Sequence, residues 1–216
     1  MPVVRIAPLL AAVLGLAPAA LAQVSLASLD TFEDGSLSGW LGATRSNALG
    51  GPAGAADRYL RVDNGGTGQK VATFNADARW SGDFQSARVT AIQADLTNFG
   101  PASMEIRLVL FGGNAITGGG RWTSSTAVVL APNSGWRTVT FNLDQPSLTS
   151  VLGSVPYPTL MATVTQIMFR HDPGTPSSGG AAGDGLIGID NVRAIPTPGA
   201  GGVLLLGAGW LGRRRR

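Results

Sequence analysis

The single histidine of this chain limits the catalytic chemistry that the sequence can support. His171 is followed by Asp172, but a Ser-His-Asp triad also needs a serine held on a sharp turn. Gly35 to Gly39 has Leu37 where a Gly-x-Ser-x-Gly turn requires that serine. We therefore interpret His171 as a surface residue at the end of a strand. With one histidine and no cysteine, a zinc site built from His and Cys ligands is excluded.

Glycoside hydrolysis needs two carboxyl groups on either side of the scissile bond. The chain has two glutamates, Glu33 and Glu105. Glu105 alternates with apolar residues and shares the polar side of its segment with Arg107, which predicts a solvated pair on a sheet surface. We therefore predict that the protein is not an enzyme; a polysaccharide lyase or hydrolase is the least favoured class.

Carboxylates near the two ends of the central segment favour calcium, a hard cation that binds oxygen ligands. Glu33 and Asp34 follow the first expected strand, and Asp190 lies in the last one, on the side opposite to Ile189. Asp30 is a weaker candidate ligand. The alternative is a set of ordinary surface carboxylates beside a sheet edge.

Sugar binding would use an aromatic ring against a pyranose and polar groups for the hydroxyls. Arg79-Trp80 and Arg121-Trp122 each place a guanidinium beside an indole, and we predict that these four residues bind ligand. The alternative places both tryptophans in the core or at its rim, with arginine stacked as a cation–π pair. We interpret Trp40 as structural, and likewise Trp136, which leads into an alternating segment.

Short alternating segments between glycine-rich turns predict the elements that must position these residues. The pattern is typical of half-buried strands, each with one wet face. The expected strands are 29–33, 59–63, 70–75, 92–96, 104–110, 126–130, 138–143, 164–170 and 185–193. One helical turn is expected within 146–152, and 173–183 reads as a mobile loop. This predicts an all-β fold, a two-sheet jelly-roll sandwich over residues 23–195.

Both ends carry sorting features. Residues 1–22 read as a signal peptide, with Arg5 before an apolar run and Ala20-Leu21-Ala22 as a cleavage motif. Residues 196–216 end in an apolar run, 199–212, and four arginines. The run is shorter than the ~20 residues that span a bilayer comfortably. We predict a short hydrophobic sorting helix with transient membrane association; a permanent anchor is the alternative.

The two ends also explain the charge. The chain has 16 basic and 13 acidic residues, but five of the basic ones lie in the ends, which leaves 11 in the central domain. That domain is therefore slightly acidic, and no nucleic-acid partner is predicted.

The tail resembles the PEP-CTERM sorting signal of bacterial exported proteins, with Pro196-Thr197-Pro198, an apolar run and terminal arginines. Thr197 stands where the family has glutamate. The resemblance implies processing by an exosortase-type protease and a location at the cell envelope, the cell surface or the extracellular matrix.

The central segment resembles galactose-binding-like sandwiches, which include many carbohydrate-binding modules. The resemblance rests on the opening 30–35 and 38–40, the middle motif 80–84 and the closing 187–192. It implies that Glu33 and Asp190 bind one structural Ca²⁺. We therefore expect a non-catalytic exported protein that binds or organises polysaccharide; a structural envelope protein without sugar specificity is the alternative.

Overall fold

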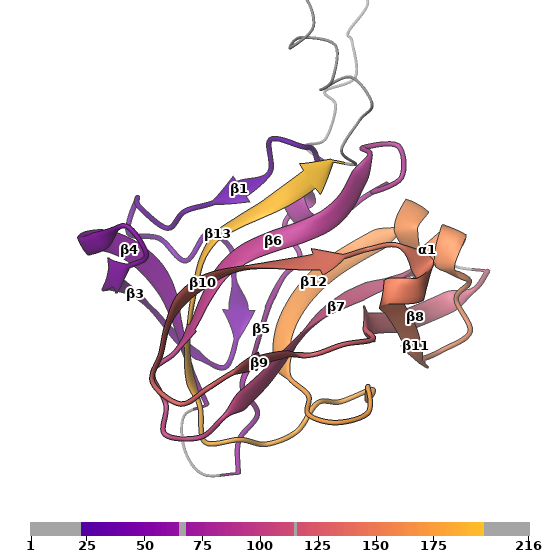
Figure 1. Ribbon diagram of the computed structural model, residues 1–216. Helices are drawn as coiled ribbons and strands as arrows, with labels where there is room; N and C mark the ends of the chain where they lie inside the picture. Colours follow the sequence, from indigo (N-terminus) through magenta and orange to yellow (C-terminus); the bar gives the residue numbers. More distant parts are fainter. Residues whose placement is uncertain (1–22, 65–67, 115, 197–216) are drawn as a thin grey trace, which may run out of the picture.

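Two antiparallel sheets pack face to face in the computed structural model, which describes residues 23–64, 68–114 and 116–196 (Figure 1). Sheet A has the order β10-β6-β13-β4-β3, with β1 beside β13. Sheet B has the order β11-β8-β7-β12-β5-β2, with β9 beside β7. The predicted all-β sandwich of two sheets is confirmed.

The strands have the following bounds. Those of sheet A are β1 (Leu29–Asp30), β3 (Thr44–Gly51), β4 (Gly54–Asp63), β6 (Val89–Asn98), β10 (Ser134–Asn142) and β13 (Leu186–Pro196). Those of sheet B are β2 (Leu41–Gly42), β5 (Ala72–Asn75), β7 (Met104–Asn114), β8 (Gly118–Ser124), β9 (Val128–Leu130), β11 (Leu148–Leu152) and β12 (Val164–His171). The helical elements are η1 (Ala78–Trp80), η2 (Gln145–Ser147) and α1 (Tyr157–Ala162).

The core lies between the sheets and follows the alternation read from the sequence. Ile106, Leu108 and Leu110 of β7 are fully buried and pack in one cluster with Ile187 and Ile189 of β13. Because side chains alternate along a strand, the residues between them point to the outer faces. The outer faces of the two sheets are therefore formed by a second, separate set of side chains.

Several element boundaries differ from those expected. β1 ends at Asp30 instead of Glu33, since Phe32 has a positive φ of 60° that breaks the extended chain. The expected helical turn within 146–152 is η2 followed by strand β11. Strand β8 was not predicted, because the run Gly118-Gly119-Gly120 shows no alternation of apolar and polar side chains. Position 120 needs glycine, because a Cβ there would lie 2.7 Å from Val155 Cγ2.

The predicted signal peptide and sorting tail lie outside the described residues and stay predictions. Among the helices of the described part, none has the length and apolar character needed to cross a bilayer.

Candidate functional site

The outer face of sheet B carries three rows of side chains that the strand register aligns across the sheet. The rows are Ala72, Arg170 and Arg107; Leu41, Phe74, Met168, Val109, Thr123 and Thr149; and Gln166, Phe111, Arg121 and Leu152. They alternate along the strands with core residues such as Leu108 and Leu110, so they point away from the core. The face combines arginines with apolar side chains.

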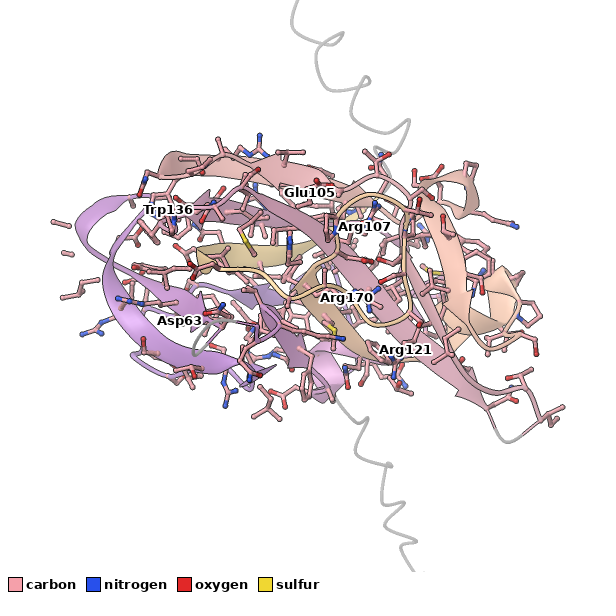
Figure 2. All side chains as sticks on the ribbon, turned by 90° about the horizontal axis from the view of Figure 1, so that it is seen from below. Asp63, Glu105, Arg107, Arg121, Trp136 and Arg170 are labelled. Atoms are coloured by element: carbon pink, nitrogen blue, oxygen red, sulfur yellow. The ribbon has the colours of Figure 1, made fainter. Side chains whose placement is uncertain are left out.

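The segment 173–185 lies against this face, and long cationic side chains hold it by its backbone carbonyls. Arg170 Nη1 and Arg121 Nη1 donate to Ser178 O at 3.0 and 2.9 Å, and Lys70 Nζ donates to Gly179 O at 2.9 Å. In Figure 2, Arg107, Arg170 and Arg121 follow the curve of this loop. The expected loop is therefore present, but it is tied to the sheet by many hydrogen bonds, contrary to the mobile loop that we predicted.

Asp172 anchors the start of the loop to two buried arginines. Arg170 Nη2 lies 2.9 Å from Asp172 Oδ2, and Arg107 Nε lies 3.8 Å from the same oxygen. Burial acts to raise the pKa of Asp172, but hydrogen bonds from Ser177 and Arg170 outweigh it and hold this pKa below its ordinary value. Burial also lowers the pKa of Arg107, which is 2% exposed, so the expected solvated Glu105–Arg107 pair is corrected to a buried arginine.

A hollow of about 260 Å³ opens beside Arg121 on the same face. Its lining includes Phe111, Arg121, Leu152 and Thr165 together with three glycines. Arg121 Cζ lies 4.9 Å from the ring centroid of Phe111, a cation–π distance. Arg121 donates one hydrogen bond, to Ser178 O, and its other N–H groups have no partner among the described residues. They are available to a ligand in the hollow.

Trp122, the neighbour of Arg121, points the other way. It lies opposite Leu110 in the register and packs half-buried against the core. Its indole Nε1 donates to Val155 O at 3.0 Å, and its ring meets Tyr157 edge to face at 5.9 Å. Its place on the inner side of sheet B removes Trp122 from the predicted sugar platform, while Arg121 stays a candidate.

Trp80 cannot serve as a sugar platform either, because it is 0% exposed. Its Nε1 and that of Trp40 donate to the same oxygen, Asp30 Oδ2, at 2.7 and 2.8 Å. Arg79 Nη1 lies 2.9 Å from the other oxygen, Asp30 Oδ1. Asp30 Oδ2 thus accepts two indole N–H groups inside the protein, and Oδ1 forms an ion pair with Arg79, so we withdraw Asp30 as a calcium ligand and Arg79 and Trp80 as ligand-binding residues.

The remaining candidate calcium ligands belong to an acidic region beside sheet A. Asp190 is 1% exposed, and its pKa is raised to about 7, first by burial and then by the charges of Asp57, Asp95 and Glu33. Glu33 Oε1 accepts the backbone N–H of Arg58 at 3.0 Å. Asp34 is exposed and accepts the N–H of Ser36 in a turn. In the described part of the chain, no three His, Cys, Asp or Glu residues form a group that could hold a metal.

His171 is 7% exposed, so the predicted surface histidine is corrected to a buried one. Its Nδ1 accepts the backbone N–H of Glu105 at 3.0 Å. An imidazole that accepts there is neutral, and burial lowers the pKa of His171, although the Glu105 and Asp172 charges act against this. The ring therefore supports the β7–β12 pair.

Sequence reasoning missed Phe74, Phe111 and Arg170 as members of one surface. Alternation places each of them on the side of its strand that faces away from the core, but the strand order that joins them could not be predicted from the sequence.

No protein-family model and no curated protein matches the sequence. Solved structures match in fold. An exo-β-agarase aligns with a TM-score of 0.55 at 14% identity, over 79% of this chain and 24% of that chain. The present chain thus spans about a quarter of the length of that enzyme.

Two further matches are carbohydrate-binding modules of similar size. A family 11 module from Clostridium thermocellum, in complex with a β-1,3-1,4-mixed-linked tetrasaccharide, aligns with a TM-score of 0.50 at 19% identity, over 78% of this chain and 95% of that chain. A solution structure of CtCBM11 aligns with a TM-score of 0.50 at 21% identity, over 83% and 98%. At such identities the similarity shows a shared β-sandwich fold.

Proposed function

We propose that this domain is a non-catalytic jelly-roll module that binds polysaccharide on the outer face of sheet B. The observation that carries the proposal is Arg121, which lies over Phe111 beside a hollow of about 260 Å³ and has further N–H donors without a partner in the described part of the chain. The fold shared with carbohydrate-binding modules supports the class of ligand.

The chemistry of the face suits a sugar chain. A guanidinium can donate hydrogen bonds to vicinal hydroxyl oxygens. Because Arg121 already lies over the Phe111 ring and donates to Ser178 O, its side chain loses little rotamer freedom when a ligand binds. Across the sheet, Phe74 and Met168 are half-buried neighbours, and Leu41 beside them is 49% exposed. Apolar side chains of this kind cover the C–H faces of pyranose rings.

The ends of the chain supply the setting of the proposal. A signal peptide at 1–22 and a PEP-CTERM-like tail at 196–216 would export the protein and hold it briefly at the membrane until an exosortase-type protease releases it. The domain would then organise polysaccharide at the cell surface or in the matrix. Mass spectrometry of the surface-exposed form tests this part, since a mature protein that keeps Arg213 to Arg216 would indicate a permanent anchor.

We also propose that Glu33 and Asp190 would hold a structural Ca²⁺. The carboxylate oxygens are of the right chemical type, and the buried Asp190 has three acidic neighbours that a cation would neutralise. A bound cation would join the chain after β1 to β13 and would add stability by binding only the folded state.

A matched pair of arginine variants tests the sugar site. Arg121→Gln and Arg88→Gln each remove one positive charge, but Arg88 is exposed and lies just before β6, a strand of sheet A. Affinity electrophoresis in mixed-linkage β-glucan, xylan and agarose should show retardation of the wild type and of Arg88→Gln, and a loss on the order of tenfold in affinity for Arg121→Gln. A wild type that none of these polysaccharides retards would favour the structural envelope protein instead.

A further inference from the structure

Three aromatic side chains gather on the outer face of sheet A, on the opposite side of the sandwich from the proposed sugar site. Tyr59 comes from β4, Trp136 from β10, and Phe99 from the residue after β6. Trp136 meets Tyr59 at 5.1 Å and Phe99 at 6.0 Å between ring centroids, both edge to face. Tyr59 and Phe99 lie 5.6 Å apart. We call these three residues the aromatic trio; none of them belongs to the core cluster.

A glycine in the central strand makes room for the trio. A Cβ at Gly188 of β13 would lie 2.6 Å from Trp136 Cη2 and 3.0 Å from Phe99 Cε2. Real Cβ atoms essentially never show the first distance, and the second is tighter than most of their contacts, so the two rings lie directly on the backbone of β13 because position 188 has no side chain. The indole Nε1 of Trp136 also donates to Gly50 O at 3.1 Å, which fixes its orientation. The rings are thus held in place before any ligand arrives.

Part of the trio remains open to solvent. Phe99 is 38% exposed and Trp136 is half-buried, whereas Tyr59 is 6% exposed and contacts both of them. Large aromatic side chains that stay partly wet and rigid are typical of binding surfaces, because they offer contact area at a small entropic cost.

Polar groups follow the trio along the same face. Thr138 lies two residues beyond Trp136 in β10, and its register partner is Asp95 of β6. Thr138 Oγ1 lies 2.5 Å from Asp95 Oδ1, and Asn191 Nδ2 lies 2.9 Å from Asp95 Oδ2. An aromatic platform beside hydroxyl, carboxylate and amide groups matches a pyranose, which has apolar C–H faces and a rim of hydroxyls.

We infer that the aromatic trio is a second polysaccharide-binding surface, with Trp136 and Phe99 as its platform. The inference rests on the proposed function and extends it, because a domain with sugar sites on opposite faces joins two polysaccharide chains. Such a domain is a cross-linker, and the combined binding of two sites exceeds that of either one.

Single-face variants of the full domain test the inference with the same mixed-linkage β-glucan, xylan and agarose. Wild-type protein that is monomeric by light scattering should raise the turbidity of a polysaccharide that it binds, with a maximum at an intermediate protein-to-polymer ratio. Trp136→Ala and Phe99→Ala should still bind that polysaccharide but should lose the turbidity maximum. Leu49→Ala, at a 57% exposed position of the neighbouring strand β3, should behave like the wild type.

The outcomes separate the two surfaces. Cross-linking that survives in both Trp136→Ala and Phe99→Ala overturns the inference and leaves the sheet B site standing, and the trio then serves to cover Gly188. Binding that survives Arg121→Gln and disappears in Trp136→Ala, with unchanged melting curves, supports the trio and removes the sheet B site. A wild type that binds no member of the panel overturns both. If the Trp136→Ala variant unfolds, the turbidity assay of Phe99→Ala decides between the outcomes, because Phe99 is the more exposed of the two side chains.

Discussion

Trp80 Nε1 lies 2.7 Å from Asp30 Oδ2, so an expected sugar platform and an expected metal ligand are hydrogen-bonded to each other inside the protein. Asp30 is 1% exposed, and burial raises its pKa above the ordinary value, although the Trp40 and Trp80 hydrogen bonds and Arg79 work against this. The carboxylate thus joins the chain at β1 to the η1 turn.

Asp30→Ala should be strongly destabilising, because it leaves the indole N–H groups of Trp40 and Trp80 unpaired in the core and removes one of the two carboxylates that pair with Arg79. We expect a loss of about 3 kcal/mol or more in the free energy of unfolding, measured by urea denaturation. Asp30→Asn keeps an acceptor oxygen and should lose less. Asp34→Asn, at an exposed turn, should leave the urea midpoint unchanged, and equal losses for the Asp30 and Asp34 variants would contradict the role of the buried carboxylate.

His171 should make the domain less stable in acid. Burial lowers its pKa below the unfolded value of 6.5, so the folded state binds fewer protons than the unfolded state. The contribution of His171 is therefore complete above pH 6.5 and is lost as the pH falls through the folded-state pKa. His171→Asn can accept the Glu105 N–H without titrating. Its melting temperature should fall less between pH 7 and pH 5 than that of the wild type; parallel curves would show that His171 does not titrate.

Asp172 should decide whether segment 173–185 stays on sheet B. Asp172→Asn removes the counter-charge of Arg170 and Arg107, both 2% exposed, and we expect a cost of about 3 kcal/mol. Proteinase K should then cut within this segment under native conditions. Asp184→Asn is the matched control, because Asp184 is exposed in the same segment and forms no ion pair among the described residues. Equal resistance of both variants would mean that hydrogen bonds to Ser177 and Ser178 hold the loop without Asp172.

Calcium should raise the melting temperature of the wild-type domain. At a concentration 100-fold above the dissociation constant, binding to the folded state alone adds about 2.7 kcal/mol. Chelator should reverse the increase, and Asp190→Asn should abolish it, whereas Asp83→Asn, on the distant 81–88 segment, should retain it. An unchanged melting curve in chelator, with no metal by elemental analysis, would mean that Glu33 and Asp190 hold no cation and that Asp190, with its pKa raised to about 7, is partly protonated near neutral pH instead.

Local pattern was enough to predict the class of fold and much of the core. Residues such as Ile106, Leu108 and Leu110 alternate with residues on the opposite side of the strand, and this period-two signal depends only on backbone geometry. The sequence also argued against a Ser-His-Asp triad and a His/Cys zinc site, because the chain has one histidine and no cysteine. The strands rich in glycine were not readable, since the reason for those glycines is a contact with a distant segment, as between Gly120 and Val155.

The sequence alone thus determined the alternation of each strand, while the tertiary structure decided which residues meet. Arg79-Trp80 and Arg121-Trp122 have the same local pattern and were predicted to act alike. Arg79 and Trp80 are held by Asp30, about fifty residues away in the chain, whereas Arg121 lies on the outer face of sheet B above Phe111. The physical reason is that a dipeptide fixes the relative direction of two side chains, but only long-range strand pairing sets which of them faces the core and what covers the other.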